Sequence, residues 1–128
     1  MKKTDVLVIG AGIGGLTTAI KIAEKRKDLQ IMVLTKTNEN ESNTRYAQGG
    51  VAAVWNDDKD TFKKHVDDTL DAGDGLCNLG AVEIVTSEGP QRVQEIIEWG
   101  TRFDKNDANK YDLGREGGHS ENRILHYK

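Results

Sequence analysis

The chain has little with which to cross-link or stiffen itself. It contains one cysteine and one proline among 128 residues. A lone cysteine cannot form an internal disulfide, and no signal-peptide pattern precedes the first apolar run, so we expect a reducing, cytoplasmic setting. No cationic cluster surrounds Cys77 in the sequence, and we therefore expect a small buried apolar side chain there rather than a reactive thiol.

Long apolar runs and aromatic residues are also scarce. No run approaches the roughly 20 apolar residues that a membrane-spanning helix requires. The net charge of −3, with acids and bases interspersed, disfavours nucleic acid or an anionic membrane as the main partner and favours a small-molecule ligand. The length fits one domain, but an aromatic content of 5% and a mean hydropathy of −0.63 indicate a thin core, as in part of a larger protein.

The first third of the chain has the pattern of a strand, a helix and a second strand. Residues 5–9 form a short, continuous apolar run, which is typical of a strand buried on both faces. Between residues 14 and 26 apolar residues recur at helical spacing, and cations gather at the carboxyl end. Residues 29–34 repeat the first pattern. This order predicts a right-handed βαβ unit and an α/β fold.

The middle of the chain has helical patterns. Residues 61–72 have an apolar stripe, Asp60 is a candidate N-cap, and Gly73 is a candidate left-handed stop. A helical hairpin is expected to follow, with Asn78 capping the first helix.

Pro90, which suits the first turn of a helix, predicts a separate second helix that ends at Gly100. Residues 35–45 are expected to form an extended loop, and residues 105–112 a solvated loop or hairpin tip.

Three glycines occupy the turn between the first predicted strand and helix. Gly10, Gly12 and Gly15 make the pattern G-x-G-x-x-G in the context that the dinucleotide fingerprint requires. The first glycine permits the tight turn, the second lets the main chain approach a pyrophosphate, and the third allows close helix packing. The phosphates would meet the free N–H groups at the start of the helix. The pattern therefore predicts a dinucleotide cofactor.

The end of the second predicted strand leaves the kind of dinucleotide open. A nicotinamide-binding unit usually places Asp or Glu about 20 residues after the glycines. Here that place is occupied by Thr35 and Lys36. Lys36 could favour the 2′-phosphate of NADP, could contact a flavin nucleotide, or could be a solvated lysine at the end of a strand.

Residues 42–54, SNTRYAQGGVAAV, have no helical or strand period at their start. With GAGIGG before them and REGGHSENRILH after them, they give three blocks by which the chain resembles the L-aspartate oxidase branch of the succinate dehydrogenase and fumarate reductase flavoprotein family. The resemblance implies a Rossmann-like FAD-binding βαβ unit with added helices, as an incomplete FAD/NAD(P)-binding domain. Residues 1–128 would be its N-terminal part. The capping domain, the C-terminal helical domain and the main catalytic arginine would lie elsewhere, and this piece alone would be inactive.

The resemblance implies a site for FAD. Residues 11–14 and Lys36 would hold the ADP half, and residues 43–50 would wrap the flavin. The chemistry of the residues agrees, because Thr44 and Gln48 can hydrogen-bond to ring heteroatoms and a glycine pair lets main-chain N–H groups approach the ring. The expected cofactor-binding residues are Gly10, Ala11, Gly12, Ile13, Gly14, Gly15, Lys36, Asn43, Thr44, Arg45, Tyr46, Ala47, Gln48, Gly49 and Gly50.

Asn43 marks a departure within the family. Succinate-oxidising relatives carry SHT where this chain has SNT, and their histidine bonds covalently to the flavin. An asparagine cannot form that bond, so we expect dissociable, non-covalent FAD.

In REGGHS the resemblance assigns Glu116 the role of orienting L-aspartate. A carboxylate can pair with the α-ammonium group that distinguishes aspartate from succinate. Arg115 and His119 could contact a substrate carboxylate. The family pattern also differs here, since Gly114 replaces a usual threonine and SENR replaces a more basic SHRR.

The implied reaction is oxidation of L-aspartate to iminoaspartate, with O2 or fumarate as acceptor, as the first step of de novo NAD biosynthesis. Coupling to quinolinate synthase would follow. The alternatives are a fumarate reductase or succinate dehydrogenase flavoprotein subunit, an NADP-dependent reductase, and a non-catalytic nucleotide-binding module. No metal is expected, because His65 and His126 lack ligand spacing with other residues.

Overall fold

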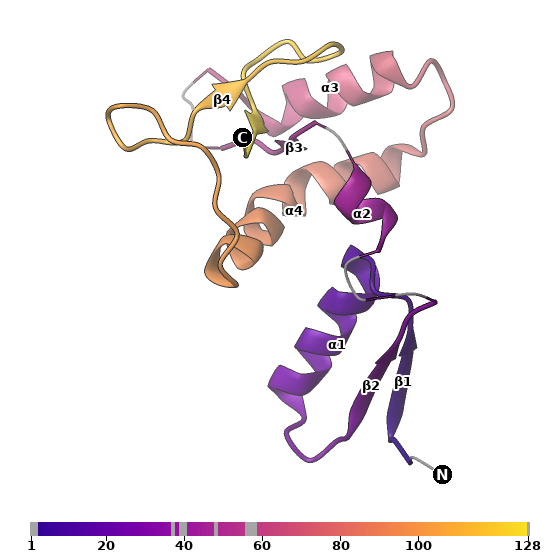
Figure 1. Ribbon diagram of the computed structural model, residues 1–128. Coiled ribbons are helices and arrows are strands. Elements are labelled where there is room, and N and C mark those ends of the chain that lie inside the picture. The colour runs from indigo at the N-terminus through magenta and orange to yellow at the C-terminus, as the bar shows by residue number, and fades with distance from the viewer. Residues whose placement is uncertain (1–2, 37, 39–40, 48, 56–58, 128) are drawn as a thin grey trace. The chain divides into compact units, whose positions relative to one another are not determined.

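The computed structural model describes residues 3–36, 38, 41–47, 49–55 and 59–127 (Figure 1). The chain divides into two compact units, Met1–Gln48 and Gly49–Lys128. Each unit has its own strands and helices and is described by itself. Among the described residues no helix is both long enough and apolar enough to cross a membrane.

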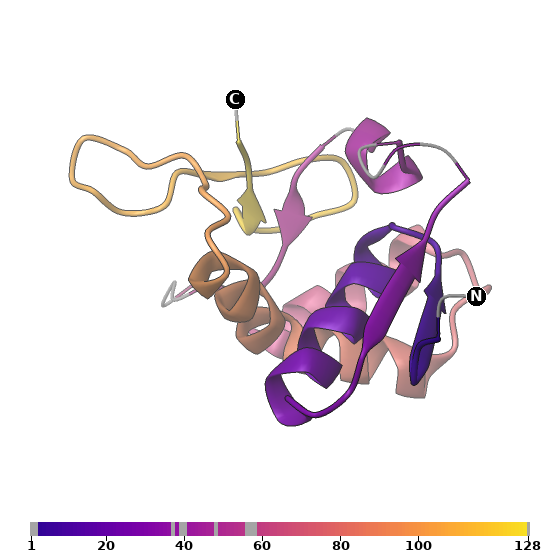
Figure 2. The same cartoon turned by 60° about the horizontal axis from the view of Figure 1, so that its bottom comes forward.

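The first unit is built on a parallel strand pair. Strands β1 (Val6–Ile9) and β2 (Ile31–Leu34) pair in register from Val6 opposite Ile31 to Ile9 opposite Leu34. Helix α1 (Ile13–Lys25) connects them and packs against both, as Figure 2 shows. The predicted order of strand, helix and strand is confirmed, with each strand slightly shorter than its apolar run.

Only one face of this strand pair is covered. Val8 faces α1 at Gly15, whereas Leu7 is 49% exposed and Ile9 79% exposed. The prediction that the first strand is buried on both faces is therefore wrong for the described chain, although its apolar composition suits that environment.

The glycine turn joins β1 to α1 through two close approaches. Gly10 has φ +108°, a left-handed conformation that favours glycine, and its N–H donates to the carbonyl of Leu34 at 2.7 Å. A side chain at Gly15 would collide with the carbonyl of Gly10, and it would lie 3.4 Å from Val8 Cγ1. Gly15 therefore lets the first turn of α1 lie directly on the turn that follows β1, as the fingerprint predicts.

Substitution of Gly15 by alanine should destabilise the first unit. The new methyl group has no space, so we expect the free energy of unfolding to fall by about 1–3 kcal/mol. Gly14→Ala is the matched control, because a methyl group there meets nothing within 4 Å. Alanine is the better helix former, so the control should be unchanged or more stable by up to about 1 kcal/mol. Urea unfolding of the apoprotein measures both, and equal effects would contradict the packing role.

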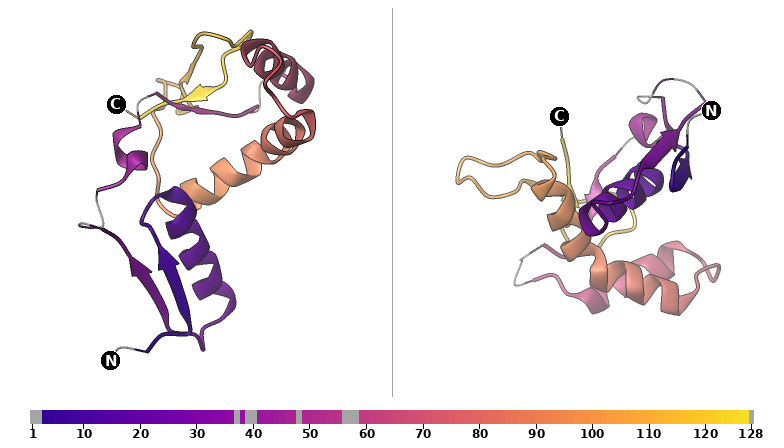
Figure 3. Two further views of the ribbon diagram at one scale, coloured as in Figure 1. Left: turned by 90° about the vertical axis from the view of Figure 1, so that its right-hand side faces the viewer. Right: turned by 90° about the horizontal axis from the view of Figure 1, so that it is seen from below.

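The second unit combines a helix pair with a small antiparallel sheet. Helices α3 (Phe62–Ala72) and α4 (Leu79–Glu98) lie side by side, as Figure 3 shows. Strands β3 (Val51–Ala52), β4 (Leu113–Gly114) and β5 (Ile124–Leu125) form a sheet in which β5 is central. A buried cluster joins the sheet to α4, and its members are Ala53, Val93 and Leu125, with Trp55, Ile97, Phe103, Tyr111 and Leu113 packed around them.

Helix α4 corrects the prediction of two separate helices. The helix is continuous from Leu79 to Glu98 and contains Pro90 in its interior. Proline lacks the N–H that an interior helical position would donate, so this helix continues at the cost of one backbone hydrogen bond. Val82, Thr86 and Val93 lie buried along the helix on both sides of the proline. This continuous packed face outweighs the local tendency of proline to begin a new helix.

The ends of α3 also differ from expectation. Thr61, rather than Asp60, is the N-cap, and its hydroxyl accepts from the N–H of Lys64 at 3.2 Å. Gly73 is not a left-handed stop, because its φ is −81°. A side chain at Gly73 would instead collide with the sulfur of Cys77, which is partly rather than fully buried. The predicted hairpin tip is confirmed by an antiparallel bridge between Lys105 and Tyr111.

Candidate functional site

The amino terminus of α1 fits the diphosphate of a dinucleotide. Its N-cap is Gly12, which supplies no capping side chain, and the first turn contains no acidic residue. Side chains added at Gly10 or Gly14 would meet nothing within 4 Å, so the main chain there is uncrowded. Uncapped N–H groups and the positive end of the helix dipole attract phosphate oxygens.

Thr44 lies at this same helix end. The N–H of Ile13 donates to Thr44 Oγ1 at 3.1 Å, and a side chain at Gly12 would lie 3.6 Å from that oxygen. The structure therefore brings together two of the predicted cofactor-binding blocks, GAGIGG and SNTRYAQGG. A hydroxyl that accepts one bond can still donate another, so this contact leaves Thr44 a proton to offer to a ligand.

A short helix replaces part of the loop that the sequence predicts. Helix α2 (Asn43–Tyr46) begins after Ser42, whose hydroxyl accepts from the N–H of Arg45 at 3.3 Å. The extended-loop prediction missed this capped turn, although a serine before a polar segment is an N-cap signal. The hydroxyl of Tyr46 donates to Glu41 Oε2 at 2.6 Å, and this bond raises the pKa of Tyr46.

Four further predicted cofactor-binding residues contribute none of the described contacts between the GAGIGG and SNTRYAQGG blocks. Lys36 is exposed after the end of β2, and Ala11 is buried in the glycine turn. Gln48 lies outside the described residues, and so does the side chain of Asn43.

The second unit brings Glu116 against Gly49. A side chain at Gly49 would lie 3.7 Å from Glu116 Oε2, and Gly49 itself has φ +102°. The Glu116 side chain is 49% exposed, so its carboxylate remains accessible from solvent. These two residues come from the YAQGG and REGGHS blocks, which are more than 60 residues apart in the sequence. The structure therefore unites the predicted substrate residue with a predicted flavin contact.

Gly50 has a structural requirement of its own. A side chain there would collide with the Ile124 side chain and the carbonyl of Leu125. The absence of a side chain thus lets the chain approach β5 closely, independently of any contact with a ligand.

A buried arginine holds the loop that carries Glu116. Arg123 is completely buried and forms a two-pronged pair with Asp60, at 2.8 Å from Nε to Oδ2 and 2.7 Å from Nη2 to Oδ1. Its Nη1 lies 2.5 Å from Asp68 Oδ2 and 3.2 Å from His119 Nδ1. Asp68 Oδ2 also accepts from the N–H and the hydroxyl of Ser120, each at 2.8 Å. These bonds tie residues 119–123 to α3 and to the residue before its cap.

The charges in this network shift the pKa values of their neighbours. Burial opposes ionisation of Asp68, but hydrogen bonds from Ser120 and Arg123 outweigh it and lower the pKa of Asp68 to about 2. Burial lowers the pKa of His65 most, and the electrostatic effects of Arg123 and His119 lower it further. His65 Nδ1 has no hydrogen-bond partner among the described residues. Asp68 is therefore ionised at neutral pH, and the environment of His65 favours its neutral form.

No local sequence pattern indicates this network. Arg123, Asp60 and Asp68 look like ordinary polar residues in the sequence, and Asp60 was expected only as a helix cap. His119 is predicted as a possible substrate contact, but its ring Nδ1 lies beside Arg123. Its main-chain N–H donates to the main-chain carbonyl of Glu116 at 3.2 Å. Arg115 is exposed.

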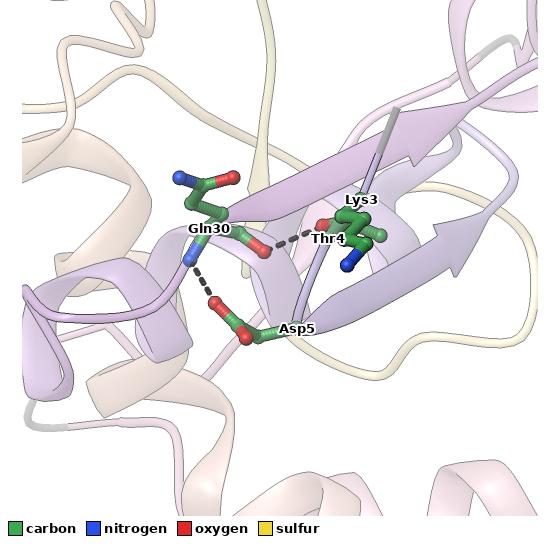
Figure 4. Close-up of a pocket in the computed structure, with 4 residues that line it drawn as sticks. All are labelled: Lys3, Thr4, Asp5 and Gln30. Atoms are coloured by element: carbon green, nitrogen blue, oxygen red, sulfur yellow. Dashed lines mark hydrogen bonds between the residues drawn. The ribbon is translucent and has the colours of Figure 1, made fainter. Parts of the chain in front are cut away.

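A pocket at the other end of the strand pair offers no comparable chemistry. Figure 4 shows Thr4 Oγ1 donating to the Gln30 carbonyl, and the N–H of Gln30 donating to Asp5 Oδ2 at 2.8 Å, with Lys3 beside them. This pocket lies before β1 and β2, whereas ligands of parallel sheets bind beyond the carboxyl ends of the strands. Across the described ranges, no group of three or more His, Cys, Asp and Glu residues could hold a metal ion.

Replacement of Arg123 by methionine should strongly destabilise the second unit. The change leaves the carboxylates of Asp60 and Asp68 without their cation, and we expect the free energy of unfolding to fall by about 3–5 kcal/mol. Lys63→Met is the control, since it breaks an exposed pair with Asp67 whose side chains are 83% and 56% exposed. That loss should stay below about 1 kcal/mol. Hydrogen exchange of α3 amides measures both, and a small effect at Arg123 would refute its anchoring role.

Comparison with known proteins gives consistent findings. A family model described as an FAD binding domain matches residues 5–128. The chain is 48% identical to an L-aspartate oxidase of Yersinia pestis over 127 residues, covering 96% of this chain and 23% of that protein. It is 44% identical to a chloroplastic L-aspartate oxidase of Oryza sativa subsp. japonica over 125 residues, covering 98% and 19%. The chain thus spans about a fifth of the length of these relatives.

Solved structures agree with the sequence comparison. The Mycobacterium smegmatis Sdh1 complex in the apo form matches with a TM-score of 0.85 and 35% identity, over 96% of this chain and 21% of that chain. An E. coli quinol fumarate reductase matches with a TM-score of 0.87 and 30% identity, over 95% and 21%. The predicted α/β fold, the resemblance to flavoproteins of this kind and the FAD cofactor are confirmed.

Proposed function

Since the chain belongs to the FAD binding domain family, we propose that its full-length gene product is an FAD-dependent oxidase of L-aspartate, which forms iminoaspartate. The L-aspartate oxidases among its relatives support this substrate. The observation that carries the proposal is the position of the Glu116 carboxylate beside Gly49, within the segment proposed to contact the flavin.

The first unit would bind the nucleotide half of the cofactor. Gly12 and the first turn of α1 would offer main-chain N–H groups to the diphosphate. The N–H of Gly10 is bonded to the carbonyl of Leu34, and Lys36, two residues after Leu34, would offer a positive charge. Residues 43–50 would contact the flavin. When bound, FAD supplies the acceptor for the hydride removed from the substrate.

Glu116 would distinguish aspartate from succinate. An ionised carboxylate forms a charge-assisted hydrogen bond with the α-ammonium group of aspartate, and succinate has no such group. A group that stabilises only one of two similar substrates in the site shifts the ratio of their kcat/KM values. Because this pairing requires no proton transfer, we assign Glu116 the role of orienting the substrate.

Substitution of Glu116 by glutamine should impair aspartate oxidation selectively. The variant keeps the size of the side chain and removes its charge, so we expect kcat/KM for L-aspartate to fall roughly 10- to 100-fold. Fumarate reduction, whose substrate lacks the ammonium group, should change less than about threefold. Glu88→Gln, on the exposed side of α4 beside Arg92, is the control and should alter neither reaction. Equal losses in both reactions of Glu116→Gln would remove its recognition role.

Asn43 supports non-covalent attachment of the flavin. An amide cannot make the covalent link that a histidine makes at this place in succinate-oxidising relatives. We therefore expect acid precipitation of the holoprotein to release all flavin to the supernatant. A succinate dehydrogenase flavoprotein treated in parallel should retain its colour in the pellet, and a yellow pellet from this protein would contradict the proposal.

A fumarate reductase or succinate dehydrogenase subunit is the second candidate. The likeness to such structures at 30% and 35% identity favours it, whereas Asn43 and Glu116 favour the oxidase. Peroxide formed from L-aspartate by the full-length gene product supports the oxidase. Strict succinate oxidation would instead support the second candidate, NADPH consumption would indicate a reductase, and no turnover would indicate a nucleotide-binding module.

The proposal also covers the electron acceptor and the fate of the product. Either O2 or fumarate would reoxidise the flavin in the cytoplasm. Iminoaspartate is reactive towards water, so an enzyme such as quinolinate synthase would consume it in de novo NAD biosynthesis. The acceptor follows from comparing turnover under air with turnover under fumarate without oxygen.

A further inference from the structure

We propose that His126 is a positioning residue for Glu116, which fixes the direction of the carboxylate that recognises the substrate ammonium group. This inference rests on the proposed function of Glu116. It concerns the last residue of the REGGHSENRILH block, ten positions after Glu116, for which the sequence pattern indicates no role.

The imidazole of His126 faces Glu116 directly. Its Nε2 lies 3.7 Å from Glu116 Oε1, and the two side chains are 27% and 49% exposed. This distance exceeds that of a direct hydrogen bond, so the interaction is a charge pair when His126 is protonated or a contact bridged by water. Oε1 thus lies near the imidazole, and both oxygens lie near Gly49, where an added side chain would be 3.7 Å from Oε2 and 4.0 Å from Oε1.

Two glycines make room for the ring. A side chain at Gly114 would lie 2.6 Å from His126 Nε2, and one at Gly50 would lie 3.0 Å from His126 Cε1. Both distances are shorter than normal contacts, so any larger residue would push the imidazole from its place beside Glu116.

The main chain holds His126 in place. The residue follows β5, whose Leu125 is completely buried and pairs with both β3 and β4. The carbonyl of His126 accepts from the N–H of Asp104 at 2.8 Å. The imidazole therefore projects from a fixed point of the sheet, whereas Glu116 belongs to a loop. A fixed partner reduces the number of orientations that the loop carboxylate can adopt.

Two substitutions of His126 separate orientation from packing. His126→Phe keeps a ring without a donor, and we expect KM for L-aspartate to rise roughly three- to fivefold, as for loss of a partly exposed charge pair, with kcat nearly unchanged. KM for fumarate should not change. His126→Gln keeps a donor near Nε2 and should restore most of the affinity for aspartate. Steady-state kinetics of the full-length holoenzyme measures both constants.

Gly114→Ala tests the same idea without altering the histidine. The methyl group would displace the imidazole, so its KM for L-aspartate should rise as in His126→Phe. Gly80→Ala, where a methyl group would lie 3.5 Å from Asn78 Oδ1 in ordinary contact, is the matched control and should leave KM unchanged. Thermal unfolding of each variant reports whether it is folded.

The outcomes separate this inference from the proposed function. Selective loss in Glu116→Gln without any selective rise in KM in His126→Phe or Gly114→Ala overturns the positioning role alone. Loss that is equal for aspartate and fumarate in the His126 variants indicates a purely structural residue and also overturns it. A Glu116→Gln variant without selectivity overturns the proposed function itself.

Discussion

The second unit depends on the buried charge of Arg123. A guanidinium group removed from water is strongly unfavourable unless carboxylates and hydrogen bonds surround it. Asp60 and Asp68 supply these partners from positions 63 and 55 residues earlier in the chain. Asp60 lies just before the N-cap of α3, and Asp68 lies within α3. The Arg123 side chain therefore joins the start of β5 to α3 at two points.

This anchor determines where the residues of the site lie. Arg123 immediately precedes β5, and His126 immediately follows it. The loop between β4 and β5 carries Glu116, and bonds from Ser120 to Asp68 restrain its second half. The buried ion pair of Arg123 therefore holds the start of β5, and the imidazole of His126 at the other end of β5 lies beside the carboxylate of Glu116. The geometry proposed for substrate recognition thus depends on an ion pair that lies outside the proposed substrate contacts.

Local signals predicted the first unit well and the second unit incompletely. The turn at Gly10 and Gly15 follows from backbone conformation and close packing, which leave a pattern in neighbouring residues. Pro90 favours the start of a helix locally, but the continuous buried face of α4 overrides that preference. The two-residue strands around β5 have too few residues for any alternation of apolar and polar side chains to appear.

The sequence by itself determined the glycine turn, the βαβ order and the identity of Glu116 as a recognition candidate, since each rests on residues within a few positions of one another or on a family motif. Only the tertiary structure decided that Arg123 is a buried anchor and that His126 lies against Glu116. Those contacts join segments far apart in the chain, and a side chain's surroundings there depend on how the chain folds back rather than on its neighbours in sequence.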